Sequence, residues 1–279
     1  MISSQTKMTG LFGHPVTHSK SPQMHNRAFQ HLGLDFVYVA FDVEPEAIGA
    51  AVQSLRALGV TGVNVTIPHK VSVIPFLDEL SSESKVIGAV NTIVNRGGRL
   101  IGCNTDGIGY LSALQEETGF DAAGKRVLLL GAGGASRAVA AQIALSGAAQ
   151  VTIAARALDQ AEALAGHLAA HAETSGITME QAAKIAHEYD LVVNATPVGM
   201  HPNVDAVPLA PSCLREGQLV SDLIYNPRIT RFLREAQERG CAISGGLGMF
   251  IHQGAHSFRL WTGQDAPVDV MRETVESFL

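Results

Sequence analysis

A run of polar residues ending in a lysine is the first feature of this sequence that suggests chemistry. Between Gly62 and Lys70, apolar residues alternate with Asn64 and Thr66, so a strand would place both polar side chains on one face. A proline then ends the strand, and Lys70 follows at its carboxyl end. Ligands of open α/β sheets bind outside the carboxyl ends of strands, so we predict a small-molecule site here. An edge strand with one solvated face would show the same alternation.

Further small polar residues occur in the first part of the chain. Ser19 and Ser21 stand two apart in a predicted loop, where Ser21 would also suit a helix cap with Pro22 at the first helical position. The other polar groups are those of Asn91, Thr92, Asn104, Thr105 and Asp106. A substrate rich in hydroxyl groups would suit such a set of hydroxyls, amides and one carboxylate.

The stretch after Val127–Leu130 has the pattern of a phosphate-binding loop. Gly131 allows a tight turn, Gly133 lets the backbone approach a pyrophosphate, and the following helix N-terminus offers N–H groups to the anion. Ser136 replaces the third glycine of the G-x-G-x-x-G pattern and is small enough to pack against the strand. Strand, turn, helix and second strand follow within about 30 residues, as a dinucleotide fingerprint requires. The alternative is a glycine-rich turn in an ordinary α/β fold.

The end of the second strand indicates which dinucleotide is bound. NAD-binding folds usually place an acid there, about 20 residues after the glycines, to bind the ribose 2′-hydroxyl. This strand ends in Ala155 and Arg156, and no acid is present. A guanidinium would pair with the 2′-phosphate of NADP, so we predict NADP as the cofactor. A solvated surface arginine is the alternative.

Composition excludes several classes of protein. The 279 residues carry a net charge of −6, and 16% of them are charged, against about 25% on average. The apolar content of 46% argues against a disordered chain. The acidic balance argues against a nucleic-acid binder, and no run of about 20 apolar residues suggests a membrane span. The N-terminus has no apolar signal region, so we expect a cytoplasmic protein.

We expect neither a disulfide framework nor a metal site. The three cysteines are odd in number and form no C-x-x-C pair. His252 and His256 are spaced i, i+4 on a predicted helix, but no third ligand is obvious. His69 stands next to Lys70 and has the position to tune the lysine.

The elements that must position these residues follow a β-α-β-α order, which predicts an α/β fold. Strands are expected at residues 9–13, 36–43, 62–67, 90–95, 100–103, 125–130, 150–155, 191–195 and 219–223. Helices are expected at residues 22–32, 45–58, 107–118, 134–146, 157–172, 249–261 and 268–278. The apolar strand Val127–Leu130 favours a parallel sheet covered on both faces. A second unit is expected to begin between Asp106 and Gly124.

In their order along the chain, these motifs resemble those of the shikimate dehydrogenase family. The matching segments are His18–Pro22, Asn64–Lys70, Gly88–Thr92, Asn104–Gly107, Gly131–Arg137, Asn194–Pro197, Asp222–Pro227 and Gly246–Gln253. They cover nearly the whole chain. Each segment alone is weakly specific, but their joint occurrence is highly specific.

The resemblance implies a two-domain α/β fold and a reaction. Residues 1–106 and 247–279 would form an α/β substrate-binding catalytic domain, to which the C-terminal helices return. Residues 107–246 would form a Rossmann-type NADP-binding domain, with the active site in the cleft. The implied reaction is the reversible reduction of 3-dehydroshikimate to shikimate with NADPH, in aromatic amino-acid biosynthesis.

The resemblance also implies roles for individual residues. Lys70 and Asp106 would be catalytic, one of them moving the proton at the developing alkoxide. The substrate-binding residues would be Ser19 and Ser21 for the carboxylate and Thr66, Asn91, Asp106 and Gln253 for the hydroxyls or ring, with Tyr225 nearby. The cofactor-binding residues would be Gly131, Ala132, Gly133, Gly134, Ala135, Ala155, Arg156, Leu223 and Gly246.

At one position the sequence departs from the family. Members often have Asn-Arg-Thr at the end of the second strand, where this chain has Ala155, Arg156 and Ala157. Two polar partners of the 2′-phosphate are therefore missing, and Gln160 stands where several members carry a base. The preference for NADP over NAD is expected to be weaker than usual.

Three other functions fit parts of the pattern. The nearest is a quinate/shikimate dehydrogenase that uses NAD or NADP. A methylenetetrahydrofolate dehydrogenase also pairs a lysine site with a dinucleotide domain. A non-catalytic dinucleotide-binding regulatory protein would keep the scaffold. The expected partner is a small-molecule substrate, with no nucleic acid and no membrane, and the chain fits a monomer or a homodimer.

Overall fold

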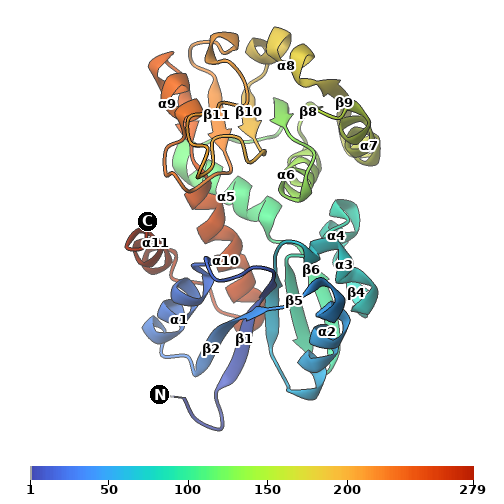
Figure 1. The fold of residues 1–279 in the computed structure, drawn as a ribbon, viewed down its shortest axis with the longest axis vertical. Coiled ribbons are helices and arrows are strands. Elements are labelled where there is room, and N and C mark those ends of the chain that lie inside the picture. The colour runs from blue at the N-terminus through green and yellow to red at the C-terminus, as the bar shows by residue number, and fades with distance from the viewer. Residues whose placement is uncertain (1) are drawn as a thin grey trace. The chain divides into compact units, whose positions relative to one another are not determined.

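The computed structural model describes residues 2–279 and divides the chain into two compact units (Figure 1). The first unit contains the residues up to Thr105 together with Ile251–Leu279, and the second contains Asp106–Phe250. The chain therefore builds most of the first unit, forms the second as one continuous segment, and returns to the first. This arrangement and the sheets described below confirm the predicted two-domain α/β fold class.

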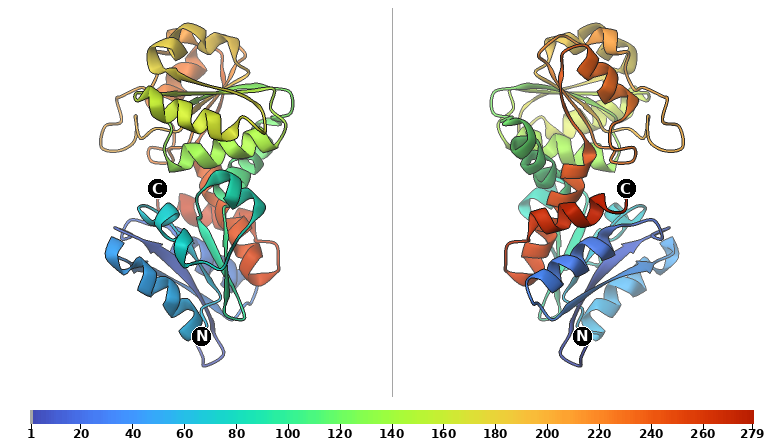
Figure 2. Two further views of the ribbon diagram at one scale, coloured as in Figure 1. Left: turned by 90° about the vertical axis from the view of Figure 1, so that its right-hand side faces the viewer. Right: turned by 90° about the vertical axis from the view of Figure 1, so that its left-hand side faces the viewer.

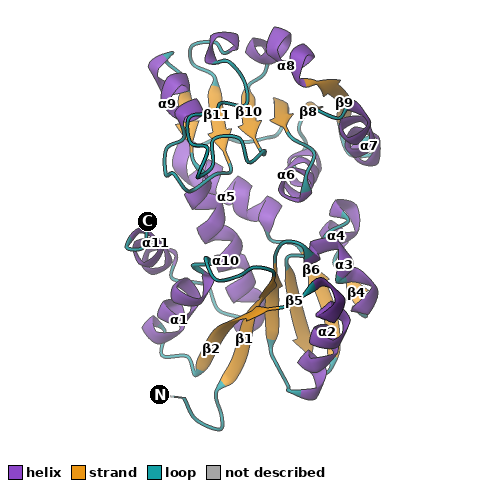
Figure 3. Ribbon diagram, in the orientation of Figure 1, coloured by secondary structure: helices purple, strands orange, loops and turns teal. Residues whose placement is uncertain are grey.

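The first unit is built on a mixed sheet with the strand order β2-β1-β3-β5-β6-β4 (Figure 3). Its strands are β1 (Lys7–Gly13), β2 (Phe36–Asp42), β3 (Gly62–Val65), β4 (Glu79–Leu80), β5 (Thr92–Arg96) and β6 (Arg99–Cys103). β1 pairs in parallel with β2 and β3, β5 runs antiparallel to β3 and β6, and β4 is parallel to β6. The carboxyl ends of β1, β2 and β3 therefore share one edge of the sheet.

Helices cover this sheet on both faces. They are α1 (Ser21–His31), α2 (Ile48–Ala57), α3 (His69–Ser72), α4 (Ser82–Ile87), α11 (Val268–Glu276) and the continuation of α10 (Gly246–Thr262), with 3-10 turns at Pro45–Ala47 and Ile74–Phe76. Val52 and Leu55 of α2 pack with Val63, Ile93 and Leu100 of the sheet. α1 packs against β2 and α11. Both layers bury apolar surface against the strands, which is what stabilises an α/β unit.

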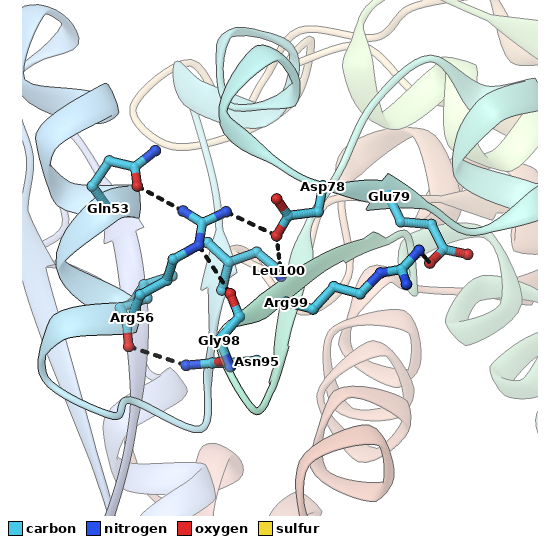
Figure 4. A network of polar contacts seen from close by, with 9 residues as sticks. Gln53, Arg56, Asp78, Glu79, Asn95, Gly98, Arg99 and Leu100 are labelled. Carbon is cyan, nitrogen blue, oxygen red and sulfur yellow. Dashed lines mark hydrogen bonds and ion pairs between the residues drawn. The ribbon is translucent and has the colours of Figure 1, made fainter.

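A polar network ties the β5–β6 hairpin to α2 (Figure 4). The Arg56 guanidinium donates to the Gly98 carbonyl at 2.9 Å and pairs with Asp78 at 2.8 Å. The Asp78 carboxylate also accepts from the Leu100 N–H at 2.7 Å. This backbone bond, followed by Arg56, lowers the pKa of Asp78. The network thereby links the turn between β5 and β6 to α2.

The second unit contains a wholly parallel sheet with the order β12-β11-β10-β7-β8-β9. Its strands are β7 (Arg126–Leu130), β8 (Gln150–Ala155), β9 (Glu173–Thr178), β10 (Leu191–Asn194), β11 (Leu219–Asp222) and β12 (Ala242–Ser244). Its helices are α5 (Asp106–Thr118), α6 (Gly134–Leu145), α7 (Leu158–Leu168), α8 (Met179–Ile185), α9 (Arg231–Glu238) and the first turn of α10, with 3-10 turns at Ala186–Glu188 and Pro211–Cys213.

The two faces of this sheet are covered by different helices. Leu128, Val192 and Val220 pack with Ala182 of α8 and Phe232 of α9 in one buried cluster. α6 and α7 lie side by side on the other face (Figure 2). The sheet is therefore covered on both sides, which is why the central strand β7 is an uninterrupted apolar run from Val127 to Leu130.

Most predicted elements occur within a few residues of their predicted bounds, but two of the alternatives left open by the sequence are wrong. Ser21 does not cap α1: the helix begins at Ser21 itself, and the preceding Lys20 provides no side-chain cap bond. β3 ends at Val65, two residues earlier than predicted, and it is no edge strand, because it lies between β1 and β5 with all its residues buried. Asn64 therefore faces the interior.

Several elements of the second unit were not predicted from the sequence: β9, α8, α9 and β12. The predicted helix over residues 157–172 ends at Leu168, because the chain turns into β9. Thr178 and Gln181 form a reciprocal capping box at the start of α8, which is a recognisable start signal. Within residues 2–279, every helix is too short or too polar to cross a membrane.

Candidate functional site

The second unit has a pocket at the point where its strand order reverses. β7 lies between β10 and β8, and the loops that follow these three strands line one pocket of about 1410 Å³. These loops contribute Gly131–Gly133, Ala155–Ala157 and Ala195–Val198. Ligands of open parallel sheets bind at such a reversal, outside the carboxyl ends of the strands.

The glycine loop after β7 has the geometry of an anion site. Gly131 has φ +113°, and a Cβ there would lie 3.0 Å from the Ala195 carbonyl oxygen. Ser136 donates its hydroxyl to the Gly131 carbonyl, which holds the turn closed. At Gly133 and Gly134 an added Cβ would meet no atom within 4 Å, and no side chain caps α6. α6 thus begins beside the pocket-lining Gly133 with no side-chain cap on its N-terminal N–H groups, as pyrophosphate binding requires.

Arg156 lies on the rim of this pocket, at the end of β8. Its side chain is exposed, whereas Ala155 before it is buried. Among the described residues that line the pocket, Arg156 is the cation and Asp205 the carboxylate. A single guanidinium beside a glycine loop fits the 2′-phosphate of NADP.

The pocket also includes residues that were not predicted from the sequence to bind the cofactor. Met179 opens α8, Thr196 follows β10, and the segment from residue 200 to 208 forms a further wall. The segment Asn194–Pro197 is one of the family motifs. This motif was the sequence signal from which Thr196 could have been predicted. The 200–208 segment carries no motif, so only the structure identifies it.

Four residues predicted to contact the cofactor do not line the pocket: Gly134, Ala135, Leu223 and Gly246. Leu223 and Gly246 are nevertheless neighbours, because a Cβ on Gly246 would lie 2.1 Å from the Leu223 carbonyl oxygen. Only glycine permits this approach of α10 to the turn after β11. Tyr225 stacks on Phe250, with ring centroids 5.1 Å apart.

The first unit holds a buried network of uncharged polar side chains. Ser257 of α10 is its centre. The Ser257 hydroxyl donates to the Gln253 carbonyl at 3.0 Å, and its oxygen lies 2.9 Å from the Asn64 amide nitrogen. The hydroxyls of Thr92 and Thr105 lie 2.8 and 3.1 Å from it. Serine, asparagine and threonine from β3, β5, α10 and the segment after β6 thus hydrogen-bond to one another.

Asn91 is fixed by the same network. Its Oδ1 accepts from the Thr105 N–H at 2.8 Å and from the Thr92 hydroxyl at 2.9 Å. Its Nδ2 donates to the Thr105 hydroxyl at 2.9 Å. These partners determine which end of the amide carries the oxygen, so Asn91 has one defined orientation.

Tyr38 extends the network to the start of α1. Its hydroxyl donates to Asn64 Oδ1 at 2.8 Å. Burial raises the pKa of Tyr38 well above its usual range, and a hydrogen bond with Ser21 acts in the opposite direction. Ser21 is buried, whereas Ser19 is half-buried and its hydroxyl accepts from the Ser21 N–H at 3.3 Å.

Lys70 stands on α3, directly beyond the carboxyl end of β3. The α3 turn is anchored by His69, whose Nε2 lies 2.7 Å from the Val43 carbonyl and therefore carries a proton. The Lys70 carbonyl accepts from the Val90 N–H at 2.8 Å. Lys70 and Thr66 are half-buried, as is Gln253 on α10. Asp106 is buried and begins α5 of the second unit.

Residues 2–279 contain no group of three or more His, Cys, Asp or Glu side chains placed to hold a metal ion. Burial, followed by the neighbouring His252, lowers the pKa of His256.

The fold and pocket of the second unit define a dinucleotide-binding protein, with a second α/β unit that carries a polar, largely uncharged site. Three family models match in succession: the shikimate dehydrogenase substrate binding domain over residues 11–93, shikimate / quinate 5-dehydrogenase over 113–206, and the shikimate 5'-dehydrogenase C-terminal domain over 246–276. The chain belongs to the shikimate dehydrogenase family.

Individual proteins agree with this assignment. A shikimate dehydrogenase (NADP(+)) of Methanopyrus kandleri is 48% identical over 98% of this chain and 96% of its own length. A crystal structure of a shikimate dehydrogenase in complex with NADP+ superposes with a TM-score of 0.93 at 43% identity, over 100% of this chain and 97% of that one. The crystal structure of the Thermus thermophilus enzyme in complex with NADP(H) and shikimate superposes with a TM-score of 0.89 at 39% identity, over 98% of this chain and 100% of that one.

Proposed function

We propose that this protein is an NADP-dependent shikimate dehydrogenase, which reversibly reduces 3-dehydroshikimate to shikimate. The observation that carries the proposal is that the family match extends over both units, so the polar site of one and the phosphate loop of the other occur in one chain. This reaction belongs to aromatic amino-acid biosynthesis.

In this proposal the second unit binds the cofactor. The N–H groups around Gly131–Ala135 hold the pyrophosphate, and Arg156 pairs with the 2′-phosphate beside Ala155. Leu223 and Gly246 lie near the nicotinamide. The bound cofactor supplies hydride chemistry, and the protein supplies binding, orientation and the proton.

The first unit, with Asp106 from the start of α5, binds the substrate. Ser19 and Ser21 hold the carboxylate by neutral hydroxyl donors. The ring and its hydroxyls are held by Thr66, Asn91, Asp106 and Gln253, with Tyr225 nearby. The defined amide orientation of Asn91 allows it to distinguish donors from acceptors on the substrate.

Lys70 and Asp106 are the proposed catalytic pair. An ammonium at Lys70 stabilises negative charge developing on the carbonyl oxygen and donates a proton there, and Asp106 holds the adjacent hydroxyl. Lys70 is suited to this because α3 holds it at the carboxyl edge of the sheet through its own carbonyl and through His69.

The test is the initial rate of nicotinamide reduction by the purified protein with four substrate pairs: shikimate or quinate, each with NADP+ or NAD+. Fast turnover of shikimate with NADP+ supports the proposal. Comparable rates with quinate or NAD+ would assign the protein to the broader quinate/shikimate activity. Cofactor binding without turnover of either alcohol would refute an enzymatic function.

A further inference from the structure

A buried carboxylate with no cationic partner lies behind the cofactor pocket. Asp222 is the last residue of β11 and is 0% exposed. Among the residues that the structure describes, no lysine, arginine or histidine pairs with it. Its oxygens instead accept hydrogen bonds from Asn194 Nδ2 at 3.1 Å, the Ile224 N–H at 3.0 Å and the Thr230 hydroxyl at 2.8 Å. A buried charge is tolerated only where such donors satisfy it.

The Asn194 side chain connects this carboxylate to the pocket wall. Its Nδ2 binds Asp222 and the Val198 carbonyl, and its Oδ1 accepts from both the N–H and the hydroxyl of Thr196 at 3.0 and 2.7 Å. Thr196 and Val198 line the pocket. Because the carboxylate only accepts, it forces the nitrogen end of the Asn194 amide toward itself and the oxygen end toward Thr196.

A second connection runs to the turn after β11. The bond from the Ile224 N–H to Asp222 closes this turn, and the Leu223 N–H donates to the Asn194 carbonyl at 3.0 Å. The Leu223 carbonyl then lies against Gly246. One carboxylate thus orients both segments that follow β10 and β11 at the carboxyl edge of the sheet.

The third connection runs to the start of α9. The Thr230 hydroxyl binds Asp222 and also accepts from the Leu233 N–H at 3.3 Å, which caps α9. Loss of the Thr230 hydroxyl would remove the cap of α9 and leave the bond between Asp222 and Asn194 intact.

We propose that Asp222 is a positioning residue for the cofactor: through Asn194 it fixes Thr196 and the adjoining pocket wall, and through Ile224 it fixes the Leu223 turn. Asp222 itself does not line the pocket. The inference rests on the proposed function only in taking the ligand of this pocket to be NADP(H).

The direct test measures NADPH binding by calorimetry, without any substrate, for Asp222→Asn. The amide nitrogen of the new side chain would face groups that donate hydrogen bonds to Asp222 in the wild type. Asn194 and the adjoining pocket wall would then lose their defined orientation. We expect the dissociation constant of NADPH to rise about tenfold to a hundredfold. The KM for shikimate is expected to change less than twofold. A folded Asp222→Asn protein that binds NADPH as tightly as the wild type would overturn the proposal.

Thr230→Val is the matched control, because it also removes one donor to Asp222. We expect a lower melting temperature and an unchanged dissociation constant. An equal loss of affinity in this variant would mean that Asp222 acts only through general stability, which would also overturn the proposal.

Asn194→Ala is a second variant for the case that Asp222→Asn fails to fold: it removes the link to Thr196 and leaves the Ile224 and Thr230 donors on Asp222. We expect a loss of NADPH affinity of the same size. An affinity equal to that of the wild type counts against the proposal. Since no step requires turnover of shikimate, failure of the proposed function would be seen separately, in the rate assay.

Discussion

The two units support their polar sites in different ways. Behind the site in the first unit, Ser257, Asn64 and Thr92 satisfy one another with no charged member. Behind the pocket in the second unit, Asn194 and its neighbours are oriented by the carboxylate of Asp222. Neutral groups both donate and accept, so each bond in the first network depends on the others. A carboxylate only accepts, so it fixes its donors alone but carries a desolvation cost.

The difference matters because the buried titratable groups of the two units respond oppositely to acid. In the first unit His25 is fully buried, stacked on Tyr38 at 4.5 Å, and burial lowers its pKa to about 3. In the second unit burial raises the pKa of Asp222 to about 6, against the effect of its hydrogen bonds. A fall in pH therefore destabilises the folded first unit through His25 and stabilises the folded second unit through Asp222.

The largest expected effect separates catalysis in the first unit from binding in the second. Lys70→Ala should lower kcat by about 10²–10⁴-fold with a smaller change in KM, because it removes the proton donor from the transition state. Steady-state kinetics with shikimate and NADP+ measures both constants. Lys85→Ala, which removes an exposed lysine from α4 of the same unit, is the control. A near wild-type kcat in Lys70→Ala would remove the catalytic assignment.

The next effect tests the acid sensitivity of the first unit. The pKa of His25 in the folded protein lies below the ordinary 6.5, so the unfolded state alone gains a proton as the pH falls below 6.5. Wild type should lose about 3 kcal/mol relative to His25→Phe between pH 7 and pH 4. A packing cost of the substitution itself is the same at both pH values and cancels in this difference.

The readout for this unit is the fluorescence of Trp261 during unfolding in urea. Trp261 is the single tryptophan of the chain, and its ring lies 5.4 Å from that of His25. The same dependence on pH in wild type and variant would show that His25 does not set the acid response.

A somewhat smaller effect of opposite sign is expected in the second unit. The folded-state pKa of Asp222 is about 6, above the ordinary 3.8, so its stabilising contribution is complete below pH 3.8 and lost as the pH rises through 6. Relative to Asp222→Asn, the wild type should lose about 2–3 kcal/mol between pH 4 and pH 7. Hydrogen exchange of the β11 amides, corrected for the intrinsic exchange rate, measures this difference in stability between the wild type and the variant. A constant difference across this range would contradict the raised pKa.

The smallest effect concerns Arg156, which is exposed and therefore screened by solvent and salt. Arg156→Ala should raise the KM for NADPH about tenfold and leave that for NADH unchanged, with a smaller difference at high ionic strength. Lys125→Ala removes another exposed cation of the second unit and controls for net charge. Equal effects on both cofactors would exclude a role at the 2′-phosphate.

The parts of the site that the sequence predicts are local. The turn at Gly131, the helix start behind it and Arg156 at the end of β8 lie within about 30 residues, so their types and spacing already specify the geometry. Lys70 was likewise predicted from its place after a strand and a proline. These positions also belong to segments by which the family is recognised.

The supporting residues were not predictable in this way. Ser257 binds Asn64 across 193 positions of sequence and Thr92 across 165, and no local spacing marks such partners. The alternation around Asn64 suggested a small-molecule site or, as the alternative, an edge strand with a solvated face, whereas β3 is an interior strand whose Asn64 binds Ser257 of α10. Asp222 belongs to a family motif, but nothing in that motif shows that its carboxylate turns toward Asn194.

The sequence by itself therefore determined the α/β class, the phosphate loop, the candidate cofactor and the family, because each depends on residue types at short, regular spacing. Only the tertiary structure decided which polar side chains are buried, which partners satisfy them and hence how the amides of Asn91 and Asn194 are oriented. The physical reason is that the free energy of a buried polar group depends on its nearest donors and acceptors, and folding brings these together from distant parts of the chain.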